Sequence, residues 1–329
     1  MTFDQDEKRK GLADTLASET SPSLTLAAQF DGRLQRYADA RERALGMSDY
    51  IRGHVPPSPE KNRVLGLLET CGSYLVFRDY YTIGQIKLAG ICSCKKHLIC
   101  PLCAIRRGAK SVRAYLDKLK VIQQENPGLQ AYLVTLTVKD GENLRERFTH
   151  LERSLKRYHK QRTHAIQGLR APVEANKALG MVWSFEVKKG KNSRLWHPHA
   201  HAIWLCHERP YKITLAAEWQ EITGDSFIVD VTPFHDQNNV ASGFLEVFKY
   251  AVKFSSMEYA DTWEVYKTLS GRRLVNSNGL FRGVKIPESM IDEDLPEDLP
   301  YIEMFYRFIR GSGYHFVQVD NVNGSSLPA

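Results

Sequence analysis

The sequence contains no long apolar run and few cysteines. No stretch reaches the roughly 18 apolar residues of a transmembrane helix, and the N-terminal "MTFDQDEKRKGLADTLASET" has early acids and no apolar core. We therefore expect neither a membrane span nor a signal peptide. Four of the six cysteines lie between Cys92 and Cys103. That spacing disfavours a secreted disulfide framework and favours metal binding in a cytoplasmic protein.

The composition is that of a globular protein with an excess of positive charge. Hydrophobic residues make up 43% of the 329 residues and charged residues 25%. The 45 Lys and Arg against 38 Asp and Glu give a formal net charge of +7. This balance favours an anionic partner, of which nucleic acid is the commonest.

Changes in composition divide the chain into four regions. We expect residues 1–60 to be a polar, loosely attached region with one helix near 24–45, ending at a proline-rich break. Residues 61–125 would hold the cysteine cluster and a basic helix, residues 126–256 the main core, and residues 257–329 a C-terminal extension. In that extension we expect an acidic linker, "PESMIDEDLPEDLP", then a helix, "IEMFYRFIRG", and a disordered end.

The main core alternates between strand and helix patterns. Apolar and β-branched runs predict strands at 131–140, 180–189, 199–206 and 226–234, and helical spacing predicts helices at 144–165, 214–223 and 242–256. The order β-α-β-β-α-β, followed by a helix, predicts an α+β fold. We expect an antiparallel sheet flanked by helices, related to the ferredoxin-like arrangement.

Histidines recur at every second position in "RLWHPHAHAIWLC". The chain has only 11 histidines, yet His197, His199 and His201 alternate into an apolar strand. Alternate side chains share one face of a strand, so the rings of His199 and His201 would lie close enough to hold one metal ion. A hairpin turning near residues 192–193 would place Glu186 opposite this pair. A carboxylate with two imidazoles suits Mg²⁺ or Mn²⁺ acting on phosphate, and zinc or iron would also accept the set.

The segment "SGFLEVFKYAVKFSS" predicts a helix with a reactive polar face. Ser242 is a plausible N-cap, and Glu246, Tyr250 and Lys253 lie on the stripe opposite the apolar positions. A tyrosine phenol has a pKa near 10 and needs its oxyanion stabilised to act as a nucleophile. Neighbouring lysines would provide this, while a nearby metal would polarise a phosphate under attack.

In this order the motifs resemble a known family. An upstream "TLTV" strand, "SFEVKK", "HPHAHAIWL" and "EVFKYAVK" together resemble the rolling-circle replication initiators of small bacterial plasmids, which are single-tyrosine members of the HUH endonuclease superfamily. The resemblance covers roughly residues 70–255 and makes residues 126–256 the nuclease core.

The resemblance implies a role for each matching residue. His199 and His201 would be the HUH metal ligands, and Tyr250 would nick the origin strand, keep the 5′ phosphate and leave a free 3′-OH. Glu246 would be the general base for a terminating hydrolysis, and Lys253 would contact the scissile phosphate or the phenolate. Glu186 as third ligand of Mn²⁺ or Mg²⁺ rests on the hairpin argument as well. The implied partners are single-stranded or cruciform origin DNA and host helicase and polymerase.

The cysteine cluster "CSCKKHLICPLC" predicts a structural zinc site. Thiolates at this density suit tetrahedral Zn²⁺ with no position open for substrate. The candidate ligands, of which we expect four to bind, are Cys92, Cys94, His97, Cys100 and Cys103. Cys71 is a further candidate.

Several alternatives share part of this pattern. The basic helix after the cysteines and the helix at 144–165 are candidates for DNA-backbone contact. A HUH transposase or mobilisation relaxase would use the same chemistry. A zinc-stabilised DNA-binding regulator would need no Tyr250. A metal oxygenase with His199, His201 and Glu186 as a facial triad would depend on iron.

Overall fold

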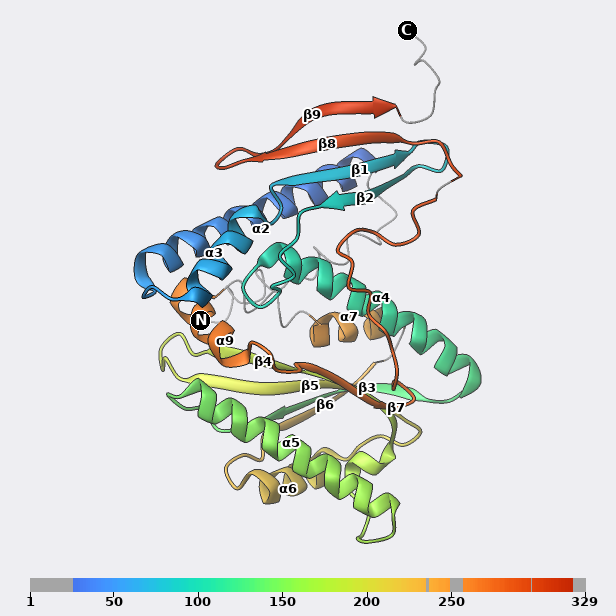
Figure 1. Cartoon of the computed structure of the whole chain (residues 1–329). Coiled ribbons are helices and arrows are strands. Elements are labelled where there is room, and N and C mark those ends of the chain that lie inside the picture. Colours follow the sequence, from blue (N-terminus) through green and yellow to red (C-terminus); the bar gives the residue numbers. More distant parts are fainter. Residues whose placement is uncertain (1–25, 235–236, 249–256, 297, 322–329) are drawn as a thin grey trace. The chain divides into compact units, whose positions relative to one another are not determined.

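Figure 1 shows the computed structural model, which describes residues 26–234, 237–248, 257–296 and 298–321. The chain forms two compact units. Unit 1 draws on Met1–Arg107, Ser255–Trp263 and Pro287–Ala329, and unit 2 on Gly108–Phe254 and Glu264–Ile286. Both units combine antiparallel sheets with flanking helices, so the predicted α+β class is confirmed.

The sheet of unit 2 has five antiparallel strands in the order β6-β3-β5-β4-β7. The strands are β3 (Gln130–Thr137), β4 (Ala178–Lys189), β5 (Trp196–Cys206), β6 (Val229–Pro233) and β7 (Val275–Gly279). Without β7 the order is that of a ferredoxin-like βαββαβ unit. The last strand, β7, comes from beyond the predicted core and extends the sheet along β4.

Helices cover both faces of this sheet (Figure 1). One face carries α5 (Leu144–Ile166) and α6 (Lys212–Thr223), and the other carries α7 (Gln237–Phe248) and the second half of α4 (Pro101–Glu125). A short 3₁₀ turn, η1 (Glu174–Lys177), precedes β4. None of the helices in the described ranges combines the length and apolarity needed to cross a bilayer.

Alternation along the strands decides which side chain meets which helix. On the α5 face, Phe185 meets Phe148 at a ring separation of 5.3 Å, and the indole of Trp219 donates to the Thr137 carbonyl at 2.6 Å. On the α7 face, Val182 and Ile203 join Phe244 in one buried cluster. Apolar side chains therefore anchor helices on both faces, and on the α7 face the strands β4 and β5 become polar toward their hairpin end, at Glu186 and His199.

The predicted helix at 242–256 is found in part. The helix α7 begins at Gln237, so Ser242 lies inside it and the predicted N-cap at Ser242 is wrong. Its Phe244, Val247 and Phe248 are buried as the apolar spacing requires. Residues 249–256, which include Tyr250 and Lys253, lie outside the described residues.

Unit 1 has its own four-stranded antiparallel sheet in the order β2-β1-β8-β9. Its elements are α2 (Leu26–His54), α3 (Pro59–Thr70), β1 (Tyr74–Tyr80), β2 (Gln85–Ile91), β8 (Ile302–Ile309) and β9 (Gly313–Asn321), and α9 (Tyr259–Leu269) begins in it. Ser58 caps α3 by accepting from the Lys61 N–H. Segments from both ends of the described chain thus form one unit, whereas the sequence suggested separate N- and C-terminal regions.

Two expectations for unit 1 are wrong. The segment at 302–311 was expected to be helical, but Ile302–Ile309 is strand β8, paired with β1 and β9. Its aromatic and branched residues favour a strand once a partner edge is available. Within the N-terminal region, the described residues 26–60 are not loosely attached, because α2 buries Tyr37, Met47 and Ile51 and sets Phe30 against Phe77 at 4.9 Å.

A buried ion-pair network ties the acidic segment 287–300 into unit 1. Asp292 accepts from Arg33 at 2.8 Å and from Arg106 at 2.6 Å, and both guanidinium groups also donate to the Tyr37 hydroxyl. The backbone N–H of Leu88 donates to the same carboxylate at 2.7 Å. These bonds outweigh the desolvation of the carboxylate and lower the Asp292 pKa from 3.8 to about 2.

We predict that Asp292→Asn lowers the free energy of unfolding by about 3 kcal/mol, because the buried guanidinium group of Arg106 and the partly buried one of Arg33 lose their counter-charge. Urea unfolding at pH 7 measures this, with the exposed Asp298→Asn as control. Since the folded pKa of Asp292 is depressed, its contribution is fully present above pH 4 and is lost as the pH falls toward 2. Equal free energies of unfolding for the two variants would contradict a stabilising role of Asp292.

Candidate functional site

A tight hairpin between β4 and β5 sets the register of the candidate metal ligands. The Gly190 N–H donates to the Leu195 carbonyl at 2.9 Å and closes the turn. In the resulting register Glu186 lies directly opposite His199, and Ser184 lies opposite His201. Cross-strand partners point to the same face, so the glutamate and both histidines project together. That face is the one covered by α7.

The three side chains form a compact, buried group. Glu186 Oε1 lies 3.5 Å from His199 Nε2, and Glu186 Oε2 lies 3.5 Å from His201 Nε2. Relative exposures are 0% for Glu186, 3% for His199 and 8% for His201. Donor atoms bound to one ion at about 2.1 Å lie roughly 3.0 to 3.4 Å apart. The spacing of these donors therefore fits a divalent cation between them.

The Nδ1 atom of each of the two histidine rings, which points away from Glu186, lies near an acceptor oxygen. His201 Nδ1 lies 3.0 Å from Thr135 Oγ1, and His199 Nδ1 lies 3.4 Å from the His197 carbonyl. A proton on Nδ1 leaves Nε2 as the lone-pair donor, which is the form that binds metals. Burial is the main cause that lowers the His199 pKa, against the opposing effect of Glu186. The neutral imidazole is thereby favoured.

The donor chemistry narrows the choice of ion. Two imidazoles and one carboxylate suit Mn²⁺, Zn²⁺ or Fe²⁺. Mg²⁺ prefers oxygen ligands and retains its water, so it fits this set less well. Among the predicted alternatives, the residues therefore fit Mn²⁺ better than Mg²⁺.

Helix α7 brings a second carboxylate to the same place. The Ser184 hydroxyl donates to the Val247 carbonyl, and Phe248 stacks on Tyr115 at 5.0 Å, which fixes α7 over β4. Glu246, one residue before Val247, then lies with Oε1 3.7 Å from His201 Nε2. Its side chain is 28% exposed, so it stands between the buried group and solvent.

Two residues near the site, Lys188 and Asp140, were not singled out in the sequence. Lys188 faces the same side as Glu186, with Nζ 3.5 Å from Oε1, and is 48% exposed. His197 is not part of the ligand group, because its Nδ1 is bound to Asp140 at the outer end of β5. The register Lys188–His197 and the bridge Gly141–Trp196 bring these residues together. The Lys188–His197 pairing follows from the hairpin, whereas Asp140 and Gly141 belong to the segment after β3.

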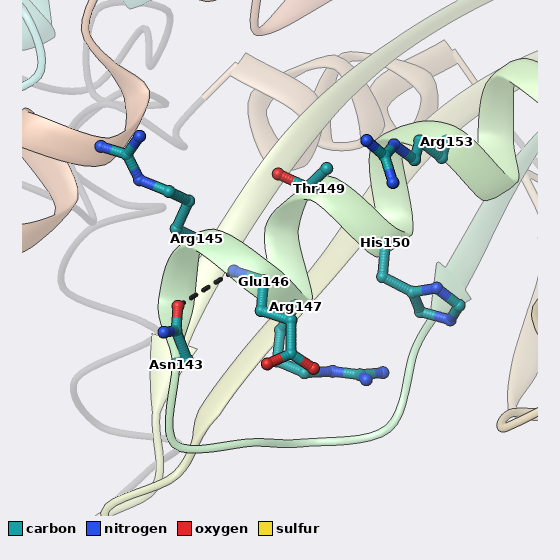
Figure 2. A pocket seen from close by; sticks show the side chains of 7 residues that line it. All are labelled: Asn143, Arg145, Glu146, Arg147, Thr149, His150 and Arg153. Atoms are coloured by element: carbon teal, nitrogen blue, oxygen red, sulfur yellow. Dashed lines mark hydrogen bonds between the residues drawn. The ribbon is translucent and has the colours of Figure 1, made fainter.

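A polar pocket opens beside this end of the sheet, at the start of α5 (Figure 2). It is lined by Asn143, Arg145, Glu146, Arg147, Thr149, His150 and Arg153. Asn143 caps α5 by accepting from the Glu146 N–H at 3.0 Å. The predicted basic helix at 144–165 is therefore present, and its first turns form a concave surface rich in arginine.

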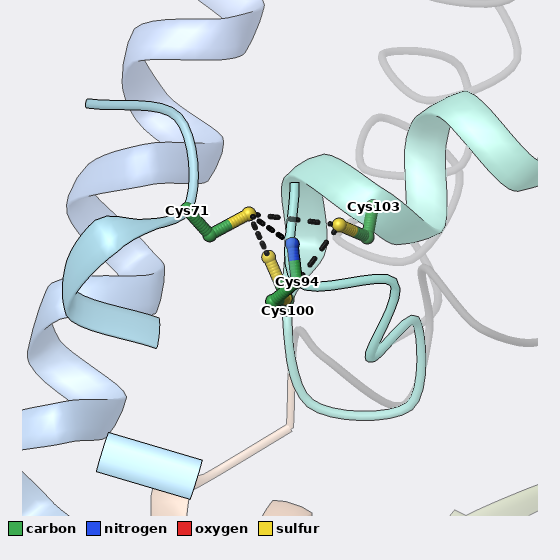
Figure 3. A group of neighbouring side chains, drawn as sticks. All are labelled: Cys71, Cys94, Cys100 and Cys103. Carbon is green, nitrogen blue, oxygen red and sulfur yellow. Dashed lines mark hydrogen bonds between the residues drawn. The ribbon is translucent and has the colours of Figure 1, made fainter. Parts of the chain in front are cut away.

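A second group of metal-ligand type lies in unit 1 (Figure 3). The Cys71 sulfur lies 3.6 Å from those of Cys100 and Cys103, and the Cys94 sulfur lies 3.6 Å from that of Cys103. Four sulfurs bound tetrahedrally at about 2.3 Å would lie roughly 3.8 Å apart. The group is buried and has the geometry of a closed Zn²⁺ site that leaves no position for substrate.

The cysteine group differs from the predicted set at one position. Cys71 is the fourth thiol, and Cys92 and His97 do not belong to the group. The Cys92 carbonyl accepts from the Gly72 N–H at 2.6 Å, which sets the end of β2 beside the residue that follows Cys71. Cys71 is 23 residues away from Cys94, so spacing within the cluster could not identify it.

We expect Cys71→Ser to lose bound zinc and to melt about 10 °C lower, because a structural zinc contributes directly to folding. Metal content by atomic emission and thermal unfolding would be measured on the same samples. Cys92→Ser is the matched control and should keep both properties. Zinc retained in Cys71→Ser but lost in Cys92→Ser would show that the other set of thiols binds.

Comparison with known proteins supports one family. The family model described as replication protein matches residues 85–303, about two thirds of the chain. "Protein rep" of Streptococcus pneumoniae serotype 2 (strain D39 / NCTC 7466) is 26% identical over 235 residues, which cover 66% of this chain and 70% of that protein. No solved structure matches. The chain therefore belongs to the replication protein family, that of the plasmid replication initiators.

Proposed function

We propose that the protein starts rolling-circle replication by nicking one strand of its plasmid origin, with Tyr250 as nucleophile. The observation that carries the proposal is the 3.7 Å approach of Glu246 to His201, because it brings the segment leading to Tyr250 to the candidate metal group. Tyr250 follows Glu246 by four residues, a span of at most about 14 Å. The membership of the replication protein family supports DNA as the substrate.

The nicking step is a transfer of a phosphoryl group. The phenolate oxygen of Tyr250 forms a bond to the scissile phosphorus while the bond from phosphorus to the 3′ oxygen breaks. The 3′ oxygen takes up a proton and becomes a free 3′-OH, which a polymerase can extend. The 5′ phosphate stays on the tyrosine. Lys253 is proposed to stabilise the phenolate or the phosphate.

The buried group orients the reacting phosphate. A divalent ion held by Glu186, His199 and His201 would polarise the phosphate oxygen and favour attack on phosphorus. Thr135 keeps His201 turned toward Glu186, and burial lowers the His199 pKa, which favours the neutral ring. The hairpin register thus presents three fixed donors on one rigid sheet surface rather than on a loop.

Glu246 is proposed to end the cycle. A single tyrosine leaves water as the second nucleophile, and water needs a base when it attacks the phosphotyrosine. Glu246 is partly exposed beside the buried group, so it can accept the proton of a water arriving from solvent. The water oxygen bonds to phosphorus, the tyrosine oxygen leaves, and no covalent link to DNA remains.

Replacement of Tyr250 tests the nucleophile. With labelled single-stranded origin DNA and Mn²⁺, the wild type should give a covalent adduct on a denaturing gel, and Tyr250→Phe should give none, because the attacking oxygen is absent. Tyr259→Phe is the control and should form the adduct normally. An adduct that persists in Tyr250→Phe would assign the nucleophile to another residue.

Replacement of Glu246 separates the two steps. Glu246→Gln should still form the adduct but release it about 100-fold more slowly, because general-base help to water is lost. The decay of purified adduct after dilution would be followed by gel. Release at the wild-type rate would remove Glu246 from the terminating step, while a failure to form any adduct would point to a role in the first one.

A further inference from the structure

The arginine pocket at the start of α5 continues into the loop that precedes β6. Asp225 of that loop is bound by Arg147 and lies 3.3 Å from His150 Nε2, and both of these residues line the pocket. The Lys139 N–H also donates to Asp225 at 3.4 Å. One carboxylate therefore joins the loop, the start of α5 and the end of the β3 segment.

Two arginines of the pocket are left for a ligand. Arg147 is neutralised by Asp225, whereas Arg145 and Arg153 are exposed and pair with no side chain among the described residues. Figure 2 shows them on separate turns of α5. The helical rise over the eight positions between them separates their backbones by about 12 Å along the axis. Glu146 is the single acid among the lining residues. The pocket thus offers two unpaired guanidinium groups at a spacing that suits an extended anion rather than a small one.

The loop beside the pocket presents two large apolar side chains to solvent. Phe227 is 67% exposed and Ile228 is 61% exposed. Two hydrogen bonds fix the loop backbone on either side of Phe227 and keep its side chain in solvent. The Thr223 hydroxyl accepts from the Ser226 N–H at 3.1 Å, and the Thr137 hydroxyl donates to the Ile228 carbonyl at 3.0 Å. An exposed aromatic ring, in a loop whose Asp225 contacts two residues of the arginine pocket, is a surface on which an unpaired base can stack.

The surface lies close to the candidate metal group. The Ile228 carbonyl is bound by Thr137, and Thr137 is the register partner of His199. Adjacent strands are spaced about 4.8 Å apart, so the backbones of Ile228 and His199 are roughly 10 Å apart. The histidines point to the α7 side of the sheet and α5 covers the other side, so a DNA strand with a phosphate at the histidines would pass around this end of the sheet to reach the arginines.

We propose that Phe227, Arg145 and Arg153 form a binding site for single-stranded DNA, in which a base stacks on Phe227 and backbone phosphates contact the arginines. The site rests on the proposed function for its substrate, but it uses neither Tyr250 nor a metal ion. Charge complementarity selects nucleic acid, and the exposed ring selects unpaired bases, since bases in a duplex are already stacked.

The test measures binding by the full chain, without added divalent ions, of a fluorescent single-stranded oligonucleotide and of a duplex of the same length. Phe227→Ala should weaken single-strand binding about 5- to 100-fold, the range for one stacked base, and leave duplex binding within twofold. Phe227→Trp should restore it. Arg145→Ala and Arg153→Ala should each reduce the slope of log K against log salt by about 0.7.

Two exposed residues at the other end of the same sheet are matched controls. Tyr211→Ala removes an aromatic ring that is 65% exposed, and Arg209→Ala removes an exposed arginine. Neither should change the preference for single strands. Thermal unfolding of each variant checks that it is folded.

The outcomes distinguish this proposal from the nicking proposal. Normal single-strand binding by Tyr250→Phe, together with loss in Phe227→Ala, supports the site whatever the nucleophile is. Unchanged binding in folded Phe227→Ala, or equal losses for single strand and duplex, overturns it. Unchanged binding would indicate that the exposed side chains of Phe227 and Ile228 contact a protein partner and not DNA.

Discussion

The register between β4 and β5 is the constraint on which the candidate site depends. It sets Glu186 opposite His199. It also brings His201, the next residue of β5 on the same face, to the same carboxylate. Because side chains alternate along a strand, a slip of one residue would turn Glu186 toward α5 and bring Phe185 into its place. The apolar partners of Phe185 on α5 oppose that slip, so the packing of one face fixes the chemistry of the other.

Burial of Glu186 makes its carboxylate favour a positively charged partner. A carboxylate with no exposed surface is costly unless positive charge or hydrogen bonds compensate it. Here two imidazole nitrogens lie 3.5 Å from its oxygens, and Lys188 approaches from the solvent side. Such an environment favours a bound cation. The Ser184 bond to α7 matters for the same reason, since it brings Glu246 close enough to add a second carboxylate at the rim.

What the sequence could predict depended on how local each pattern was. The hairpin ligands were predictable because Glu186 and His199 are joined by one short turn, and strand alternation does the rest. Cys71 could be named only as a further candidate, and strand β8 was not predicted, for the opposite reason. Cys71 meets Cys94 only through folding of the intervening chain, and β8 is a strand because β1 pairs with it from more than 200 residues away. Spacing and propensity do not encode partners of that kind.

The antiparallel topology explains why functional groups collect at one end of the unit 2 sheet. The chain leaves β3 and β4 and enters β5 and β6 at the same end of the sheet. Four segments that are separate in sequence therefore meet there. Asp140 contacts His197, and Asp225 contacts Arg147, so residues distant in sequence pair across these segments. The opposite end and the interior of the sheet are built of apolar contacts. Loops at this end of the sheet can therefore vary without disturbing the core that fixes the candidate metal ligands.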